Sequence, residues 1–499
     1  MILNAPHPAP SVLAALRSPR LLVRELLAGL VVAIALIPEA ISFSIIAGVD
    51  PRVGLFASFT MAVSIAIVGG RPAMISAATG AVALVIAPVM RDYGFDYLIA
   101  TVILGGLIQV ALALLGVAKL MRFIPRSVMV GFVNSLAVLI FVAQLVHLVD
   151  VPWLVYPLVV AGILILVLLP RLTRVVPAPL DVVVLLTGVT LLAGWQLPTV
   201  GDQGTLPDSL PMLFVPQVPL TFETLAIIGP FALGMAAVGL LESLMTAKLV
   251  DDITDTGSRK TREAWAQGVA NVITGFTGGM GGCAMIGQTM INVKVSGART
   301  RISTFAAGVF VLVLAVALRD VVGLIPMAAL VAVMIMVAVS TFDWHSVRPS
   351  TLRRMPRSET LVLAVTMALV IATGNLAIGV VVGVLTAAIL FARRVAHVAT
   401  VTRTLEQTED GAVARYAVRG ELFFASSNDL VGQFDYVDDP ARVVVDFSDA
   451  HVWDASAVAT MDAVATKYAR RGIQVEFTGM NEASAALHGR LAGGFGAET

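Results

Sequence analysis

The sequence predicts an all-α polytopic membrane protein of 14 transmembrane segments, arranged as two inverted repeats of seven helices, followed by a small cytoplasmic α/β domain. Three observations predict this architecture: the composition, the distribution of basic residues, and a change in charge and hydrophobic pattern near residue 396. Of the 499 residues, 58% are hydrophobic and 13% are charged. Soluble globular proteins carry about 25% charged residues. So apolar a chain cannot cover a water-exposed surface, which excludes a soluble enzyme.

Fourteen segments are candidate membrane spans. A spanning helix needs about 20 predominantly apolar residues. Twelve candidates are Leu26–Gly48, Val53–Gly69, Ile99–Val117, Val128–Leu148, Trp153–Leu169, Val182–Leu197, Leu225–Leu241, Trp265–Gly278, Arg301–Leu318, Leu324–Thr341, Leu361–Thr373 and Leu376–Phe391. Two more, Ser76–Met90 and Cys283–Val295, are short and interrupted by glycine.

The basic residues predict how these spans are oriented. Cytoplasmic loops of membrane proteins carry an excess of Lys and Arg. If the N-terminus lies inside and 14 spans alternate, inside loops receive 22 basic residues and outside loops receive 3. One missed span would invert every later loop, so this split favours a count of 14. We therefore expect a protein of the cell (inner) membrane with both termini in the cytoplasm.

A proline-rich stretch, residues 198–221, divides the membrane part into two sets of seven spans. The expected organisation is an N-terminal cytoplasmic segment 1–20, repeat one over 21–197, this extracellular loop 198–221 and repeat two over 222–395. An odd number of spans in each half gives the halves opposite orientations. This is the layout of an inverted-repeat transporter.

The tail, residues 396–499, differs from the membrane part in charge and pattern. It carries 8 Lys and Arg against 15 Asp and Glu, a net charge of −7, while the remaining chain carries +7. We expect short strands at Ala412–Val418, Glu421–Phe424, Arg442–Phe447 and Ile473–Phe477, with a helix over Ser456–Arg471. This order predicts a small α/β domain too polar to lie in the bilayer.

The two short segments predict a binding site. Each follows a glycine-rich stretch and is third in its half, a pattern typical of discontinuous helices that bind substrate at the membrane midplane. Two facing helix N-termini offer backbone N–H groups to an anion; close packing of small residues is the structural alternative. The candidate residues are Ala78, Thr79, Gly80, Ile286, Gly287, Gln288 and Thr289.

Two acidic residues stand inside predicted spans. Glu39 lies within the first span, and Glu242 has the equivalent position in the eighth. An ionised carboxylate at this depth is costly, so we expect each acid to be protonated, paired or facing water. Pro38 should break the first span locally. Both acids are candidates for substrate binding and proton coupling, and a structural hydrogen bond is the alternative.

Metal and cofactor chemistry receives no support from the sequence. The chain has one cysteine and six scattered histidines, with no ligand spacing typical of a metal site. Kinase and cyclase motifs are also missing, so we expect no enzyme activity, no cofactor and no nucleic-acid partner.

Several motifs together resemble those of the sulfate permease (SulP) family, the bacterial relatives of solute carrier family 26. The resemblance covers roughly residues 20–490. It rests on stretches of the sequence in the same order: Ile37–Phe56, Phe123–Phe132, Leu241–Ala247, Gln267–Asn271 and Thr289–Arg301.

This resemblance implies a uracil-permease-like fold in which a core domain moves against a gate domain, a cytoplasmic STAS domain in the tail, and a homodimer. Family members move sulfate, chloride, bicarbonate, oxalate or dicarboxylates, and bacterial members are typically proton- or sodium-coupled. Three residues depart from the family pattern: Glu39 replaces a common Gln, Phe43 a common Tyr, and Gln288 a common basic residue. The resemblance thereby also makes Phe43 a candidate for substrate binding. The chain thus lacks the usual fixed positive charge and has an extra acid.

We therefore predict a secondary active transporter that carries a small anion together with a proton by alternating access. Without a fixed cation in the site, C4-dicarboxylates such as fumarate, or bicarbonate, are favoured over sulfate. A nucleobase permease of the same fold, and an anion channel or a sensor regulated through the tail, are alternatives. In the tail, Ser456 resembles the phosphorylated Ser of STAS anti-sigma-factor antagonists and is a candidate regulatory residue, although a helix-start Ser is usually a cap.

Overall fold

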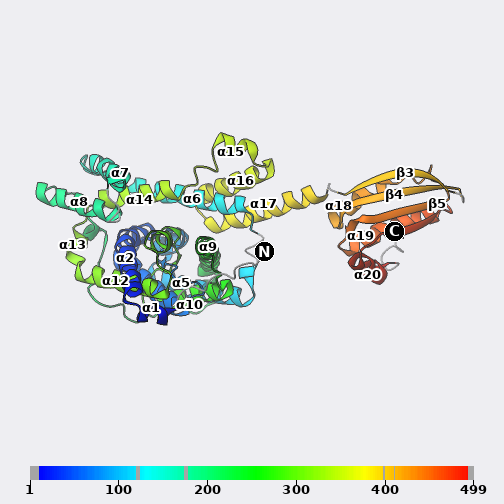
Figure 1. Ribbon diagram of the computed structural model, residues 1–499. Helices are drawn as coiled ribbons and strands as arrows, with labels where there is room; N and C mark the ends of the chain where they lie inside the picture. Colours follow the sequence, from blue (N-terminus) through cyan, green and yellow to red (C-terminus); the bar gives the residue numbers. More distant parts are fainter. Residues whose placement is uncertain (1–10, 120–123, 173–177, 397–398, 409–410, 493–499) are drawn as a thin grey trace. The chain divides into compact units, whose positions relative to one another are not determined.

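The computed structural model describes residues 11–119, 124–172, 178–396, 399–408 and 411–492. The first ten residues of the expected N-terminal segment 1–20 lie outside this range. The chain forms two compact units that divide between Val384 and Leu385, within one long helix. The first unit is helical, whereas the second contains a four-stranded sheet (Figure 1).

The first half of the helical unit begins with a short helix, α1 (Val12–Arg17). It continues with α2 (Pro19–Ala47), α3 (Pro51–Val68), β1 (Ser76–Ala77), α4 (Gly80–Tyr93), α5 (Phe95–Leu114), α6 (Arg126–Leu145), α7 (Val155–Leu172) and α8 (Ala178–Ala193). Pro38 does not break α2, contrary to the prediction. Proline removes one donor and crowds the preceding turn. Here the helix runs on, and Ser42 Oγ donates to the Pro38 carbonyl at 2.8 Å.

The second half follows residues 198–221, which contain only one short 3₁₀ turn. Its elements are α9 (Phe222–Thr254), α10 (Lys260–Phe276), β2 (Cys283–Ala284), α11 (Ile286–Met290), a π-helical turn (Ile291–Val295), α12 (Arg301–Ala317), α13 (Arg319–Gly323), α14 (Met327–Thr341), α15 (Pro349–Arg354), α16 (Arg357–Thr373) and α17 (Leu376–Ala396). The predicted span Leu324–Thr341 begins later, at Met327, because Pro326 is the N-cap of α14.

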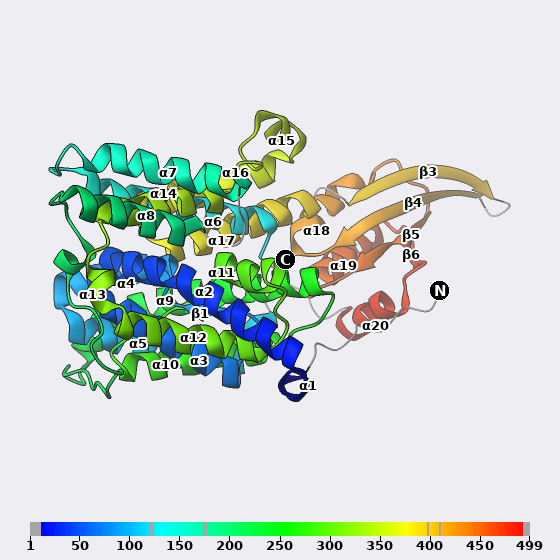
Figure 2. The ribbon, with the colours of Figure 1, turned by 60° about the vertical axis from the view of Figure 1, so that its left-hand side comes forward.

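These helices form two layers, which two views show (Figures 1 and 2). We call α2–α5 and α9–α12 the core bundle, and α6–α8, α14 and α16 the outer layer. Helices of the two halves exchange contacts: α5 packs on α9 and α10 as α12 packs on α2 and α3, while α6 packs on α16 as α14 packs on α7. Such exchange indicates two related halves; their opposite orientation and the count of 14 spans stay predictions.

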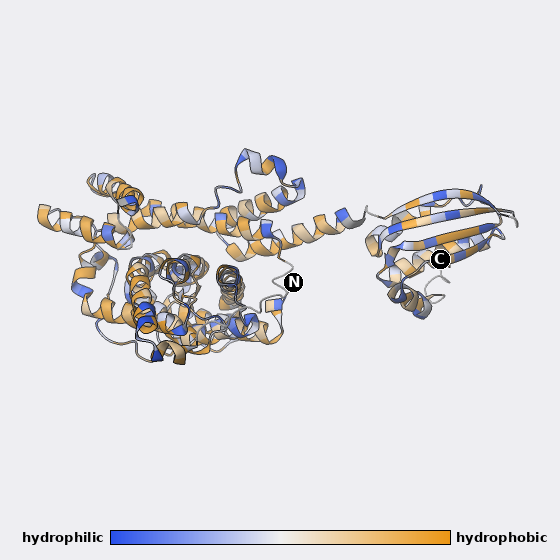
Figure 3. Cartoon of the chain, in the orientation of Figure 1, coloured by the Kyte–Doolittle hydropathy of each residue, from blue (hydrophilic) through white to orange (hydrophobic). Residues whose placement is uncertain are grey.

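Length and composition separate the helices that are suited to a membrane. Among the described residues, six helices are long and apolar enough to cross one, in α2, α3, α5, α6, α9 and α17, and four more in α7, α8, α12 and α14 are apolar but shorter. Figure 3 shows the hydrophobic colouring of these helices. We describe the protein as a polytopic membrane protein on this basis.

Close helix contacts in the core bundle depend on glycine. A Cβ on Gly106 of α5 would lie 2.7 Å from the Gly268 carbonyl of α10, and a Cβ on Gly268 would lie 2.5 Å from the Gly106 carbonyl. The two backbones are therefore in direct contact. Small residues allow this approach between membrane helices, where dispersion rather than the hydrophobic effect holds helices together.

The tail unit is an α/β domain with strand order β3-β4-β5-β6. Its elements are β3 (Thr400–Thr408), β4 (Gly411–Leu422), α18 (Phe424–Leu430), β5 (Arg442–Val452), α19 (Ala455–Ala469), β6 (Gln474–Thr478) and α20 (Glu482–Leu491). β3 pairs antiparallel with β4, while β4, β5 and β6 are parallel. The two short strands expected between residues 412 and 424 are one strand, β4, with an irregularity between Ala417 and Arg419.

A buried carboxylate organises the core of this domain. Asp439 forms an ion pair with Arg403 at 2.7 Å and accepts hydrogen bonds from the hydroxyls of Tyr416 at 2.6 Å and Tyr468 at 2.5 Å. Burial, together with the bond to Asp439, raises the pKa of Tyr468 well above its ordinary value. The carboxylate is thus fully partnered, which a buried charge requires.

Candidate functional site

The two short segments meet at a small antiparallel sheet inside the core bundle. β1 pairs with β2 so that Ser76 faces Ala284 and Ala77 faces Cys283, and Met285 N–H donates to the Ile75 carbonyl at 2.9 Å. α4 and α11 lead away from this sheet. Two short helices thus begin in the predicted segments, and a two-residue strand lies between each glycine-rich stretch and the helix that follows it.

Buried side chains satisfy the backbone around the sheet. The Asn271 amide accepts from Gly282 N–H at 2.8 Å and donates to its carbonyl at 3.0 Å, and Ser243 Oγ accepts from Ala284 N–H at 3.0 Å. Irregular backbone within a membrane protein needs such partners because no water replaces them. These polar side chains of α9 and α10 therefore fix the backbone on both sides of Cys283 in β2.

Both half-helices begin with unpaired backbone donors. Thr79 is the N-cap of α4, and its Oγ1 accepts from Val82 N–H at 3.3 Å; α11 has Met285 as N-cap and no side-chain cap. The first N–H groups of a helix have no partner within it. Five such groups have no acceptor among the described residues: those of Gly80, Ala81, Ile286, Gly287 and Gln288.

All five donors belong to residues that line one cavity. It has a volume of about 240 Å³ and lies between the core bundle and the outer layer. The lining residues are Glu39, Phe43, Thr79, Gly80, Ala81, Phe132, Val133, Leu136, Ile140, Glu242, Met245, Met285, Ile286, Gly287, Gln288, Ile291, Val337, Ser340 and Thr341. No basic residue is among them.

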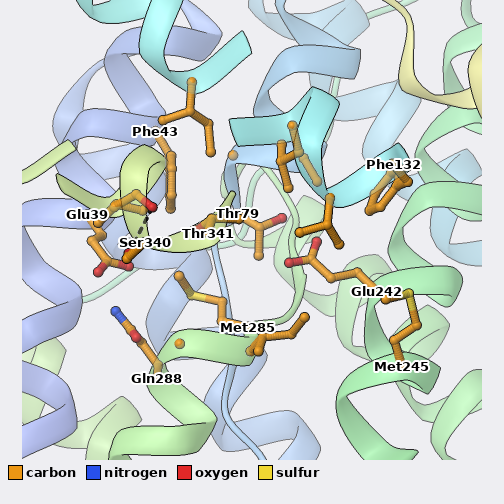
Figure 4. Close-up of a pocket in the computed structure, with 18 of the residues that line it drawn as sticks. Glu39, Phe43, Thr79, Phe132, Glu242, Met245, Met285, Gln288, Ser340 and Thr341 are labelled. Carbon is orange, nitrogen blue, oxygen red and sulfur yellow. Dashed lines mark hydrogen bonds between the residues drawn. The ribbon is translucent and has the colours of Figure 1, made fainter. Parts of the chain in front are cut away.

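The two acids lie apart in this cavity. Glu39 and Gln288 lie to one side of Thr79 in Figure 4, and Glu242 and Met245 to the other. The Glu39 side chain is 7% exposed and interacts with the Gln288 amide, while Glu242 is 9% exposed and accepts a hydrogen bond from Cys283. Neither carboxylate forms an ion pair with a described residue. Both acids thus face the cavity without a fixed countercharge.

The glycines at the two helix starts have different surroundings. A Cβ on Gly80 would lie 2.8 Å from Cε1 of Phe43 and 3.2 Å from Cδ1 of Ile140, whereas a Cβ on Gly287 would meet nothing within 4 Å. Phe43 therefore packs directly on the start of α4. The start of α11 faces open space.

Basic residues near the half-helices bind backbone carbonyls instead of entering the cavity. Arg299 donates to the carbonyls of Val293 and Ala298, and Arg301 donates to those of Ile65 and Ala66, at the end of α3. Cations are favourable at helix C-termini. The guanidinium groups of Arg299 and Arg301 thus cap helix ends on one side of the core bundle.

Eight of the ten predicted site residues line the cavity: Glu39, Phe43, Thr79, Gly80, Glu242, Ile286, Gly287 and Gln288. Ala78 and Thr289 do not. Ala78 is buried, and its N–H donates to Ser58 Oγ at 3.3 Å, while Thr289 Oγ1 accepts from Ile75 N–H at 3.0 Å. These two residues therefore form hydrogen bonds beside the β1–β2 sheet and are not part of the cavity wall.

The outer layer supplies lining residues that the sequence did not indicate. Four come from α6 and three from α14: Phe132, Val133, Leu136, Ile140, Val337, Ser340 and Thr341. They lie in predominantly apolar stretches of α6 and α14 that carry no charged residue. α6 and α14 occupy the same place in the two halves. A comparison of the two halves of the sequence could therefore have indicated these lining residues.

The start of α19 corrects the interpretation of Ser456 as a cap. Asp454 is the N-cap, and its carboxylate accepts from Ala457 N–H at 3.0 Å and from Phe424 N–H at 2.7 Å. Ser456 is the second residue of the helix and is exposed. Elsewhere, the described residues contain no cluster of three or more side chains able to hold a metal ion.

Two discontinuous helices that meet at a cavity between two helical layers are typical of a membrane transporter, and a separate α/β domain follows the helical unit in this chain. The comparison with known families leads to the same class of protein. The model of the Sulfate permease family matches residues 22–155 and 151–366, and that of the STAS domain matches residues 404–491. The chain belongs to the sulfate permease family and carries a C-terminal STAS domain.

Similar proteins extend over nearly the whole chain. The putative sulfate transporter YbaR of Bacillus subtilis (strain 168) is 49% identical over 469 residues, which cover 94% of this chain and 97% of that protein. The murine Slc26a9 anion transporter in the inward-facing state has a TM-score of 0.80 at 16% identity, covering 94% of this chain and 87% of that one.

The transmembrane domain of a cyanobacterial bicarbonate transporter, BicA, has a TM-score of 0.64 at 23% identity and covers 74% of this chain and 97% of that one. At these identities the two structures establish the fold alone. The relatives are transporters, which confirms the expectation that this chain is not an enzyme.

Proposed function

We propose that this protein is a proton-coupled symporter of a small anion, which binds between the N-termini of α4 and α11. One observation carries the proposal: one cavity is lined by five residues whose backbone N–H groups are unpaired and by two acids, and by no basic side chain. Backbone donors at helix N-termini bind anions. An anion between them would approach Glu39 and Glu242, and protonation of an acid removes the repulsion.

The coupling follows from this charge balance. Without a fixed cation, an anion and an ionised Glu39 would both be negative in a cavity of low polarity, which is unfavourable. The same holds for Glu242, so a proton on either acid makes anion binding more favourable, and the bound anion in turn makes protonation more favourable. Reciprocal coupling of this kind is required of any two ligands that affect each other's binding.

Transport would proceed by alternating access. The cavity lies between the core bundle, which contributes both helix starts, and the outer layer, which contributes only apolar and hydroxyl side chains. Movement of the core bundle against the outer layer would carry the site from one side of the membrane to the other, as in transporters built from inverted repeats.

The substrate belongs to the class of small oxyanions. YbaR is named as a putative sulfate transporter and BicA as a bicarbonate transporter. Because backbone donors alone would hold the anion here, we favour a carboxylate such as fumarate, or bicarbonate, over sulfate.

We further propose that the protein is a homodimer in the cell membrane with both termini in the cytoplasm, and that sodium is the alternative coupling ion.

The experiment is uptake by purified protein in liposomes. Labelled fumarate, bicarbonate, sulfate and uracil are offered with and without an inside-alkaline pH gradient, and with a sodium gradient at constant pH. We expect uphill accumulation of one anion that requires the pH gradient. Uracil uptake would instead support the nucleobase alternative, and anion flux that never exceeds equilibrium would support a channel.

A further inference from the structure

Cys283, the only cysteine of the chain, lies in a buried chain of hydrogen bonds that ends on Glu242. Its Sγ donates to Glu242 Oε2 at 3.0 Å and lies 3.2 Å from Thr79 Oγ1, where either atom can be the donor. All three side chains are buried. They come from three elements, β2, α9 and α4, so this contact joins both half-helix segments to an acid of the cavity.

The donors in this chain all point the same way. A thiol has one hydrogen, so a Cys283 that donates to Glu242 must accept from the Thr79 hydroxyl. Thr79 Oγ1 in turn accepts from Val82 N–H at 3.3 Å. The order is therefore Val82 N–H to Thr79, Thr79 to Cys283, and Cys283 to the carboxylate.

One oxygen of Glu242 is thereby occupied. Within the described part of the chain, no side chain other than Cys283 donates to this carboxylate. Oε1 is left for a proton or for the substrate. We infer that Cys283 is a positioning residue: it holds the Glu242 carboxylate in place through Oε2 and directs protonation to Oε1. This inference rests on the proposed function, in which Glu242 takes part in coupling.

Few titratable groups lie near this contact. Cys283 on β2 contacts Glu242, and Glu39 on α2 is the one other titratable residue among the described residues that line the cavity. On the neighbouring helix α10, Glu263 accepts from the N–H groups of Gly70 and Arg71 at 2.6 and 2.9 Å, and it does not line the cavity. A change at Cys283 therefore acts on Glu242 first.

Two substitutions separate hydrogen bonding from packing. Cys283→Ala removes the donor, while Cys283→Ser keeps one at nearly the same place. A carboxylate that loses a donor holds its charge less well, so Cys283→Ala should move the pH of half-maximal uptake upward by about one unit. Cys283→Ser should restore most of the wild-type profile.

Ser243→Ala is the matched control. Ser243 is adjacent to Glu242 and is equally buried, but its Oγ accepts from Ala284 N–H in the sheet. Ser243→Ala should lower the thermal unfolding temperature without moving the pH profile. A Cys283→Ala profile equal to that of wild type, or a Cys283→Ser profile equal to that of Cys283→Ala, would overturn the inference.

A second measurement needs no substitution at Cys283. The S–H stretching band in infrared spectra falls where other protein groups do not absorb, and here it reports a single thiol. We expect its frequency to be lowered by the bond to Glu242, to change as pH is varied, and to rise in Glu242→Gln. An S–H band that responds neither to pH nor to Glu242→Gln would contradict the inference. This result does not depend on transport: a wild-type protein that takes up no anion would refute the proposed function instead.

Discussion

The two half-helix segments have the same place in their halves but differ in construction. α4 is a regular helix of 14 residues with a Thr79 side-chain cap, and Phe43 packs on its first glycine. α11 has five α-helical residues, no side-chain cap, and continues into a π-helical turn. The first segment is a fixed wall, and the second leaves Gly287 open. The comparison teaches that the start of α4 is packed and capped, whereas the start of α11 is neither.

The largest effect should come from Gly282, where the two segments cross. A Cβ at this position would lie 1.9 Å from the Ala77 carbonyl oxygen. We expect Gly282→Ala to prevent the sheet from forming, and therefore to abolish recovery of monodisperse protein in size-exclusion chromatography. Gly287→Ala, which adds the same methyl group to the other segment in open space, should be recovered at the wild-type level; equal recovery of both variants would contradict this arrangement.

Next in size is the effect of Glu39→Gln on coupling. A gradient of one pH unit can drive about tenfold accumulation for each coupled proton. We expect Glu39→Gln either to transport the anion without a proton requirement or to lose uphill uptake, so that accumulation in liposomes falls from about tenfold to about one. Unchanged accumulation driven by pH would exclude Glu39 as the coupling residue.

A smaller effect should distinguish the two helix starts. Gly80→Ala would force Phe43 to move, at a cost of about 1–3 kcal/mol typical of overpacking, and so should lower the thermal unfolding temperature. Gly287→Ala should leave stability unchanged and instead raise the KM for the anion, because the methyl group occupies the cavity. Both quantities can be measured on the same purified samples. A lower unfolding temperature for Gly287→Ala together with a higher KM and unchanged stability for Gly80→Ala would contradict the difference between the segments.

The smallest effect concerns the caps. Thr79→Ala should cost about 1 kcal/mol, as is typical of a lost N-cap, and Thr79→Ser should recover it. At Met285 there is no side-chain cap to lose, so Met285→Leu, which conserves volume, should shift the unfolding temperature less than Thr79→Ala. Thermal scanning in detergent makes the comparison. A larger shift from Met285→Leu would show that packing, and not capping, fixes these helix starts.

Much of this site could be predicted from sequence because its signals are local. Glycine-rich stretches and short apolar runs marked both half-helices, and an acid within an apolar span is conspicuous, so Glu39, Glu242 and the helix starts were found. The resemblance to the sulfate permease family rested on longer stretches such as Ile37–Phe56 and Thr289–Arg301, and the family comparison confirmed it.

What the sequence did not indicate depends on contacts between distant elements. The apolar lining residues of α6 and α14 carry no local mark, and Cys283 looked inert until β2 brought it against Glu242 and Thr79. Thr289 and Ala78 were assigned to the cavity because they follow the same motif, but the sheet turns both away from it. In the tail, β3 was missed because most of its residues are exposed and lack an apolar stripe.

The most direct measurement records anion uptake and internal pH together in liposomes that contain purified protein and a pH-sensitive dye. With labelled fumarate or sulfate outside and no imposed pH gradient, we expect anion influx to acidify the interior, and Glu39→Gln to abolish that acidification. Anion influx through the wild-type protein with no change in internal pH would contradict proton-coupled symport.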